Sequence, residues 1–207
     1  MLNSFYPSAK AEWAAAYEKA TAAVAKMSSS EKSNIASGSL LGGRCIGNTA
    51  GARSVGYPGL CAQDSPLGIR HVKGVSAMPA GIHAASTWDL DLMKKRGAAL
   101  GAETKALGIH ILLGPVVGPL GKIPTGGRNW EGFSPDPYLT GLAAAETIKG
   151  MQAAGAQACV KHFIGNEQEH SRNSISSNID DRTLHELYLW PFADAVNAGV
   201  ASVMCSA

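Results

Sequence analysis

The stretch from Gln157 to Ser174 turns from an apolar run into a dense polar cluster within a few residues. Its first part, 158–160, has the apolar character of a buried strand. Its second part carries cations, imidazoles, an amide and carboxylates, namely Lys161, His162, Asn166, Glu167, Glu169, His170 and Arg172. Lys and Glu are rarely buried without partners, and α/β proteins place their sites where parallel strands end. The stretch therefore predicts a site at the end of a strand, with a solvated loop as the alternative.

Strand patterns alternate with helix patterns from residue 61 onward. Short apolar runs predict strands at 109–113, 158–162 and 200–205, and residues 62–72 predict a strand that runs into a loop. The expected helices lie at 88–107, 137–154, 182–190 and from Pro191 to about Asn197, and 114–137 is expected to be a long Gly- and Pro-rich loop. Their expected N-caps are Thr87, Asp136, and Asp180 or Asp181. This alternation indicates an α/β fold with a parallel sheet or a (β/α) barrel.

The first 61 residues have a different pattern. Residues 9–27 are Ala-rich, with Trp13, Tyr17 and Val24 at helical spacing, which predicts a helix. Ser28 and Glu31 match a capping box, so a second short helix is expected to start there. Residues 37–61 are rich in Gly and predict loops and turns.

Charge and composition exclude several partner classes. The net charge is only +2, and the one compact basic run is Lys94-Lys95-Arg96. This run lies inside a predicted helix, so we expect it to form a solvated face and not a nucleic-acid contact. No apolar run approaches the roughly 18 residues that cross a bilayer, so no membrane partner is expected. The first residues also lack the apolar core of a signal peptide.

The four cysteines are Cys45, Cys61, Cys159 and Cys205. No CxxC pair occurs, which argues against a structural zinc site. Cys45 and Cys61 flank a turn-rich segment that they could close as a disulfide, with a gain of about 3 kcal/mol in the chain-entropy model. Cys159 lies in an apolar run and is expected to be a buried thiol.

Common catalytic motifs are absent from the sequence. There is no HExxH or GxSxG motif, and the Gly-rich segment before Lys122 fails the phosphate-loop pattern because Val116 stands at the first Gly position. We therefore expect neither a metal nor a cofactor. What remains suits a polyol, because carboxylates accept from hydroxyls and Arg or Lys donates to them. The candidates for such contacts are Asp64, Arg70, Arg128, Lys161 and His162.

Aromatic and acidic candidates accompany this set. Trp130 is either a face for a sugar ring or a core side chain. The candidate acids are Glu131, Asp136, Glu167 and Glu169, of which Asp136 stands between two prolines and is better explained as a helix cap.

Four long segments resemble the N-terminal catalytic domain of glycoside hydrolase family 3, and most closely the fungal secreted β-glucosidases. They read CAQDSPLGIR, GPVVGPLGKIPTGGRNWEGFSPDPYLTG, KHFIGNEQEHSR and SSNIDDRTLHELYLWPFADAV. The resemblance implies a (β/α)₈ TIM-type barrel, here partial, with an N-terminal helix and long active-site loops. It implies that residues 1–207 form this barrel domain without its last strands and without the family's α/β sandwich domain.

The resemblance also assigns roles. Asp64 resembles the carboxylate that binds the hydroxyls at the far side of the glucosyl ring, and Arg70 resembles a group that lines or supports that pocket. Arg128, Lys161 and His162 resemble those that hold the remaining ring hydroxyls. Three further residues, Glu167, Glu169 and Arg172, resemble supports that orient the binding groups. The Cys45–Cys61 pair matches a family disulfide.

Two departures from the family pattern bear on activity. The family's Ser-Asp-Trp motif, which holds the nucleophilic Asp of its retaining mechanism, does not occur in the chain. Met204, Cys205 and Ser206 match a family motif, but Ala207 replaces its Tyr. We therefore expect a truncated family member, inactive by itself, whose nucleophile lies beyond Ala207. The alternatives are a non-catalytic glucose-binding fragment or pseudoenzyme and, within the family, a β-xylosidase.

The same resemblance predicts the surroundings of the chain. The expected partners are a small β-glucoside or cello-oligosaccharide and the remainder of the same polypeptide. The expected location is extracellular by family resemblance. Since the chain shows no signal peptide, an intracellular location stays open.

Overall fold

The computed structural model describes residues 7–38, 45–64 and 66–206, and the side chains from residue 13 onward. These residues group into two compact units. The first unit contains residues up to Gly42 and from Gly47 to Leu60, and the second contains Gly43–Ile46 and everything from Cys61. The single domain over 1–207 stays a prediction. No helix in the described ranges is long and apolar enough to cross a membrane.

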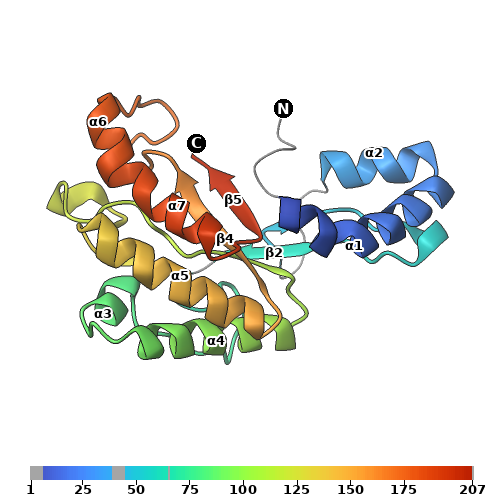
Figure 1. The fold of residues 1–207 in the computed structure, drawn as a ribbon, viewed down its shortest axis with the longest axis horizontal. Coiled ribbons are helices and arrows are strands. Elements are labelled where there is room, and N and C mark those ends of the chain that lie inside the picture. The colour runs from blue at the N-terminus through green and yellow to red at the C-terminus, as the bar shows by residue number, and fades with distance from the viewer. Residues whose placement is uncertain (1–6, 39–44, 65, 207) are drawn as a thin grey trace. The chain divides into compact units, whose positions relative to one another are not determined.

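The first unit contains α1 (Pro7–Lys26), α2 (Ser29–Ser37), the short strand β1 (Gly47–Asn48) and a 3₁₀ turn, η1 (Arg53–Val55) (Figure 1). Both predicted helices are confirmed. The capping box is present, because the Ser28 hydroxyl accepts from Glu31 N at 3.2 Å and Glu31 Oε2 accepts from Ser28 N at 2.9 Å. Trp13 and Tyr17 are exposed, so the described residues of this unit do not bury the aromatic stripe of α1.

The second unit alternates strands and helices as predicted. Its strands are β2 (Cys61–Asp64), β3 (Ile111–Leu113), β4 (Gln157–Phe163) and β5 (Ser202–Cys205). They are parallel and neighbour one another in chain order, with Ala62 opposite Ile111, Leu112 opposite Ala158 and Val160 opposite Val203. The carboxyl ends of the strands therefore lie at one edge of the sheet.

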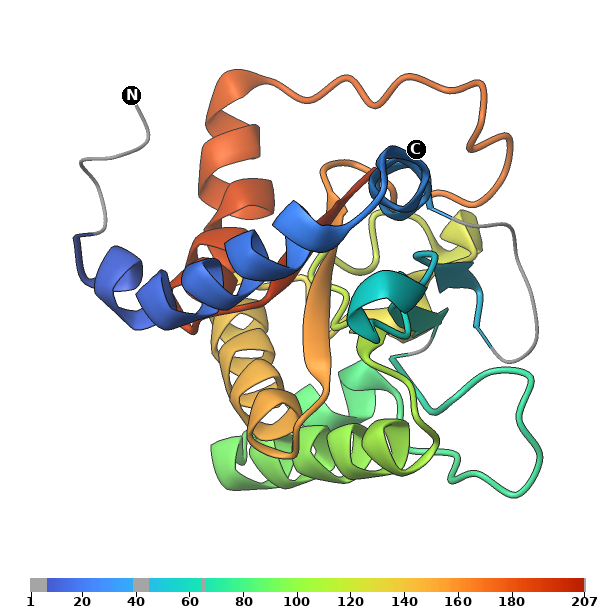
Figure 2. The ribbon, with the colours of Figure 1, turned by 90° about the vertical axis from the view of Figure 1, so that its right-hand side faces the viewer.

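Helices of the second unit cover one side of this sheet (Figures 1 and 2). They are α3 (Gly81–Ala85), α4 (Leu90–Ala106), α5 (Pro137–Ala153), α6 (Asp181–Thr183) and α7 (Trp190–Asn197), with a π-helical stretch, η4, at Leu184–Leu189. Two 3₁₀ turns, η2 (Pro124–Gly126) and η3 (Asn129–Glu131), interrupt the predicted 114–137 loop. Asp136 and Asp180 are N-caps, as predicted. The predicted Thr87 cap is wrong: Asp89 caps α4 by accepting from Leu92 N at 2.9 Å.

The core lies between the helical layer and the sheet. Met93 and Leu100 of α4 and Ile148 of α5 pack with Leu112 and Val160 of the strands. Helices α4 and α5 approach closely because they meet through glycines. A Cβ atom on Gly97 would clash with the backbone of Thr147, and one on Gly150 would clash with the backbone of Lys94. Burial of this apolar surface stabilises the layer that supports the sheet.

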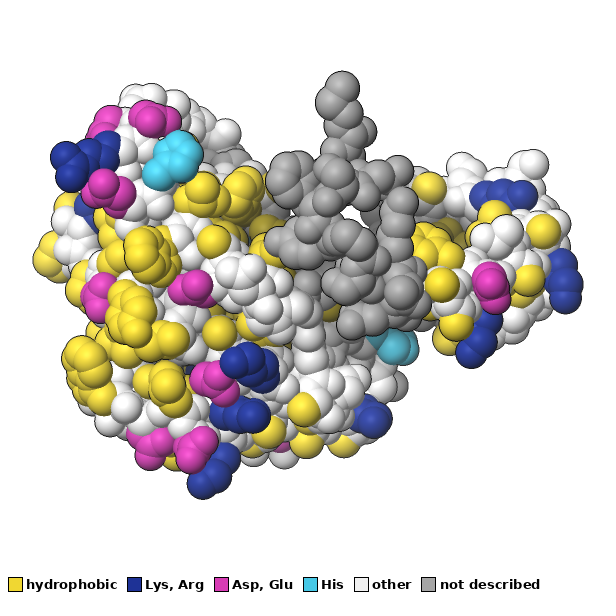
Figure 3. Space-filling view, viewed as in Figure 1, with side chains coloured by type: hydrophobic (Ala, Val, Ile, Leu, Met, Phe, Trp, Pro, Cys, Tyr) yellow, Lys and Arg dark blue, Asp and Glu magenta, His cyan; other side chains and the backbone are white. Residues whose placement is uncertain are grey.

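The helical layer is also apolar on its outer side. Figure 3 shows hydrophobic side chains gathered on the visible face over these helices. The exposed large hydrophobic residues of α4, α5 and α7 include Leu90, Leu92, Tyr138, Trp190 and Val196. The prediction that Lys94-Lys95-Arg96 forms a solvated face holds for the two lysines and is wrong for Arg96, which is 8% exposed. Arg96 lies on the buried face of α4 with Met93 and Leu100, at i−3 and i+4.

Candidate functional site

A lysine and a carboxylate from different strands meet at the carboxyl edge of the sheet. Asp64 ends β2, and Lys161 lies near the end of β4. The Lys161 Nζ atom is 2.8 Å from Asp64 Oδ1, and only 3% of the Lys161 side chain is exposed. The other oxygen of Asp64, Oδ2, accepts from Arg70 Nη1 at 2.6 Å. Asp64 thus pairs with two cations, one buried and one half-exposed.

These cations determine the charge state of Asp64. Burial alone raises the pKa of a carboxyl, because it disfavours the charged form. For Asp64 the hydrogen bonds and charges of Lys161 and Arg70 outweigh burial and lower its pKa below the ordinary value. Asp64 is therefore an ionised hydrogen-bond acceptor at neutral pH.

A second charged pair lies beside the first. Arg128 donates through Nε to Glu131 Oε1 at 2.7 Å and through Nη2 to Glu131 Oε2 at 3.1 Å. This forked geometry is the strongest arrangement of an Arg–carboxylate pair. Glu131 is 6% exposed, and its Oε2 also lies 4.0 Å from Lys161 Nζ. Glu131 was expected only as a candidate acid, and its i+3 spacing from Arg128 is the sequence signal for the pair.

His162 lies against the same guanidinium. Arg128 Nη2 is 3.3 Å from His162 Nε2. Arg can only donate, so Nε2 accepts and the ring proton belongs on Nδ1. Burial, followed by the positive charges of Arg128 and Lys161, lowers the pKa of His162 to about 3. His162 is therefore a neutral ring at physiological pH.

The three predicted supports separate in the structure. Glu169 lies 3.5 Å from Arg128 and 3.4 Å from Arg172, so it links two cations at the rim. Glu167 instead packs toward Gly118, where a side chain would overlap its carboxyl group. Burial raises the pKa of Glu167 to about 7, against the weaker effect of Lys122 and Arg128. Glu169 and Arg172 thus border the site, while Glu167 lies behind it.

An open cleft of about 820 Å³ lies over these residues. It is lined by polar and charged groups and by apolar ones, including Asp64, Arg70, Arg128, Glu131, Glu169, Arg172, Ile69, Val75 and Trp130. Trp130 is 51% exposed, so it is not a core residue. Lys161 and His162 do not line the cleft and lie beneath its charged wall. A neutral polar molecule the size of a monosaccharide would meet acceptors, donors and an aromatic face here.

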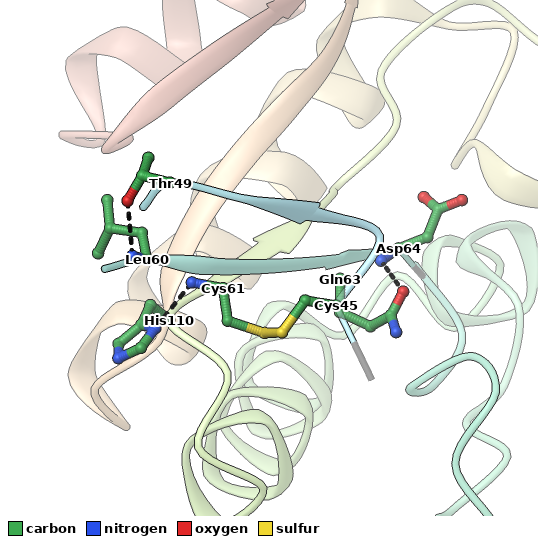
Figure 4. The surroundings of a disulfide bond; sticks show 7 residues. All are labelled: Cys45, Thr49, Leu60, Cys61, Gln63, Asp64 and His110. Atoms are coloured by element: carbon green, nitrogen blue, oxygen red, sulfur yellow. Dashed lines mark hydrogen bonds between the residues drawn. A yellow bond between two sulfur atoms is a disulfide. The ribbon is translucent and has the colours of Figure 1, made fainter. Parts of the chain in front are cut away.

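A disulfide bond joins Cys45 to Cys61, the first residue of β2, with the Cα atoms 5.4 Å apart (Figure 4). Cys61 N donates to His110 Nδ1 at 3.0 Å, and Asp64 N donates to Gln63 Oε1 at 2.6 Å. Strand β2 is therefore fixed along its length, with the disulfide at one end and the Asp64 carboxylate at the other (Figure 4). Cys159 is buried and free, as predicted.

No group of three or more His, Cys, Asp or Glu side chains in the described part of the chain has metal-binding geometry. The carboxylates that line the cleft are instead held by arginine and lysine.

The model of the glycosyl hydrolase family 3 N-terminal domain matches residues 46–207. The chain belongs to this family. Among curated family 3 relatives, a probable β-glucosidase L of Aspergillus terreus is 63% identical over 94% of this chain and 26% of its own length. That of Aspergillus fumigatus is 60% identical over 97% of this chain and 27% of its own. The chain thus spans about a quarter of the length of these relatives.

Solved family 3 structures share the fold. A β-glucosidase from Chaetomella raphigera superposes with a TM-score of 0.87 at 66% identity, over 94% of this chain and 27% of its own. β-Glucosidase 3B from Thermotoga neapolitana in complex with glucose gives a TM-score of 0.73 at 34% identity, over 81% of this chain and 25% of its own. The expected fold, a partial (β/α)₈ TIM-type barrel, is confirmed.

Proposed function

We propose that this family 3 chain forms the glucosyl-binding part of a β-glucosidase. The whole enzyme hydrolyses terminal non-reducing β-D-glucosyl residues of β-glucosides and cello-oligosaccharides, as one step in the breakdown of cellulose and β-glucan. The observation that carries the proposal is the Asp64–Lys161 pair beside the Arg128–Glu131 pair, in which Asp64, Arg128 and Glu131 line the cleft. Family membership and the names of the relatives support it.

The charged pairs suit hydroxyl binding. Ionised Asp64 can accept hydrogen bonds from two adjacent hydroxyls, while its own cations hold it in place. Arg70 and Arg128 donate from the sides, and Trp130 offers an aromatic face to the ring. Lys161 is buried behind the charged wall of the cleft and holds Asp64 in place. Because every hydroxyl of a sugar is both donor and acceptor, alternating carboxylates and cations match it.

The same pairing makes these carboxylates unsuited to bond cleavage. A retaining glycosidase needs one carboxylate free to attack and one protonated acid, about 5–5.5 Å apart. Asp64 and Glu131 are instead held by cations. We propose that both catalytic carboxylates belong to sequence outside these 207 residues, since the Ser-Asp-Trp motif of the family nucleophile does not occur here.

Titration of the purified chain with glucose tests the binding. We expect binding by the unaltered chain and its loss in Asp64→Ala, with Asp181→Ala as a control on an exposed carboxylate. Stronger binding of xylose than of glucose would favour a β-xylosidase. Hydrolysis of an aryl β-glucoside by this chain at the rate of a complete enzyme would contradict the proposed absence of catalytic groups. The gene sequence after codon 207 tests the same point through the presence of Ser-Asp-Trp in frame.

We also propose an extracellular location. The Cys45–Cys61 disulfide supports it, since such bonds persist in oxidising compartments. Fractionation of the native source, with immunodetection of the protein in medium and cells, would test this location.

A further inference from the structure

One wall of the cleft is the loop that follows β2, from Pro66 to Pro79. Residues 66–70 and 75–77 of this loop line the cleft. The loop carries Arg70, whose Nη1 donates to Asp64 Oδ2 at 2.6 Å. Asp64 belongs to the sheet, whereas Arg70 belongs to the loop, so their distance depends on where the loop lies.

The Pro66–Pro79 loop is closed at its neck. Met78 N donates to Leu67 O at 2.7 Å, which joins the two arms. Gly68 has a φ of 141°, and a Cβ there would overlap the carbonyl oxygen of Ser76 on the opposite arm. The two arms therefore touch over several residues, as in compact loops whose ends lie close together.

A single buried side chain of α4 contacts both arms just outside this neck. Arg96 Nε donates to Pro79 O at 2.8 Å, and Arg96 Nη2 donates to Pro66 O. Arg96 is 8% exposed, and burial lowers its pKa to about 10, so it stays charged at neutral pH. The planar guanidinium presents several donors in a fixed fork, which lets one side chain hold two carbonyls. A lysine ammonium is a compact point charge on a flexible stem.

A third contact from the same helix reaches the second arm of the loop. Glu103 lies two turns after Arg96 on α4, and its Oε1 accepts from Ser76 N at 2.9 Å. The helix thus holds the loop at both ends and at Ser76 on its second arm.

We propose that Arg96 is a positioning residue for sugar binding: by holding both ends of the Pro66–Pro79 loop to α4, it places Arg70 against Asp64. The inference rests on the proposed glucosyl site but adds a residue that does not line the cleft. Arg96 acts through the loop backbone and needs no contact with the sugar.

The first test compares Arg96→Lys with the unaltered chain. The variant keeps the charge but not the forked donor, so we expect glucose binding to weaken about tenfold in a calorimetric titration. Amide hydrogen exchange without glucose should become faster across residues 67–78 and stay unchanged in β4. Lys95→Met, on the neighbouring exposed lysine, is the matched control and should change neither measurement.

A double-mutant cycle tests whether Arg96 affects binding through Arg70. If Arg96 acts through Arg70, then Arg96→Lys should weaken binding no further in an Arg70→Ala background. Independent, additive losses would overturn the proposal, as would weaker binding by Arg96→Lys with unchanged loop exchange.

Two further experiments separate a failure of this proposal from a failure of the proposed function. If Arg96→Lys fails to fold, Glu103→Ala takes its place: amide hydrogen exchange at Ser76 should become faster and glucose binding should weaken. Glu103→Gln keeps the hydrogen-bond acceptor and should change neither measurement. Equal behaviour of these two variants would overturn the proposal. A lack of glucose binding by the unaltered chain would contradict the proposed function. In that case the rate of amide hydrogen exchange in the loop still tests the role of Arg96. Equal exchange rates in Arg96→Lys and in the unaltered chain would overturn that role.

Discussion

The Nζ atom of Lys161 lies 2.8 Å from Oδ1 of Asp64, although the two residues are 97 positions apart in the sequence. Strand β3 separates their strands in the sheet, and the parallel order brings both strand ends to one edge. A lysine that is 3% exposed depends on such a partner, because an unpaired buried charge is costly. Several measurable consequences derive from this cluster and its surroundings.

Replacing Asp64 by Ala should destabilise the protein as well as abolish glucose binding. The change leaves Lys161 buried without its carboxylate, at a cost of about 3 kcal/mol in the free energy of unfolding. Urea unfolding measures this loss. Glu186→Ala breaks the exposed Arg182–Glu186 pair and should cost less than about 1 kcal/mol. Equal costs of the two substitutions would contradict the buried-pair argument.

Arg128→Lys should impair binding even though it preserves the charge. A lysine cannot form the two hydrogen bonds that Arg128 makes with Glu131, at 2.7 and 3.1 Å. Glucose affinity should fall by about tenfold. Arg182→Lys, at an exposed helical position, is the control and should bind normally. Unchanged affinity in Arg128→Lys would show that only charge matters at this position.

His162 should stay neutral in the folded protein down to about pH 3. The unfolded chain takes up a proton near the ordinary value of 6.5, so stability should fall as pH drops from about 6.5 toward 3. NMR titration of the ring, assigned with His162→Gln, measures this directly. A midpoint near 6.5 would contradict the buried, cation-flanked environment.

Glu167 should give the opposite pH dependence. Its pKa is raised from 4.5 to about 7 by burial, so the folded protein holds a proton that the unfolded chain releases. Stability from this group is present below pH 4.5 and is lost as pH rises through about 7. Unfolding free energies at several pH values should decline less steeply over this window in Glu167→Gln. Identical slopes in both proteins would refute the assignment.

Removing the disulfide should lower stability without touching the cleft chemistry. Cys45→Ser removes the cross-link between residues 45 and 61, and the chain-entropy model gives a loss of about 3 kcal/mol in the free energy of unfolding. Cys205→Ser changes an exposed free thiol and should have little effect on thermal unfolding. A melting temperature equally lowered in both variants would point to a thiol effect unrelated to the cross-link.

Helices and strands were predictable because their signals are local. Asp136 and Asp180 cap the helices that follow them, as their positions before helical patterns indicate. The strand that carries Lys161 could be placed from its short apolar run, whereas residues 62–72 indicated a strand that runs into a loop without placing its end at Asp64. The structure brings the five predicted binding residues into one cluster, whereas their role toward a sugar stays a prediction.

What could not be predicted depends on tertiary contacts. Arg96 looks like Lys94 and Lys95 in composition, and only its position relative to Met93 and Leu100 places it on the buried face. The partner of Arg128 is different, because Glu131 follows at i+3 and this spacing is a signal in the sequence. The separation of Glu167 from Glu169 had none, because the loop after β4 has no repeating pattern that fixes where its side chains point.

The close contact of α4 with α5 carries a consequence for mutational tolerance. Gly97 touches the backbone of Thr147, so even the methyl group of alanine has no room there. The adjacent residue in α4 is Arg96, which holds the cleft loop. A change of one methyl group at Gly97 would therefore be transmitted through Arg96 to the loop that lines the cleft. In any survey of random variants, Gly97 should behave like a residue of the cleft.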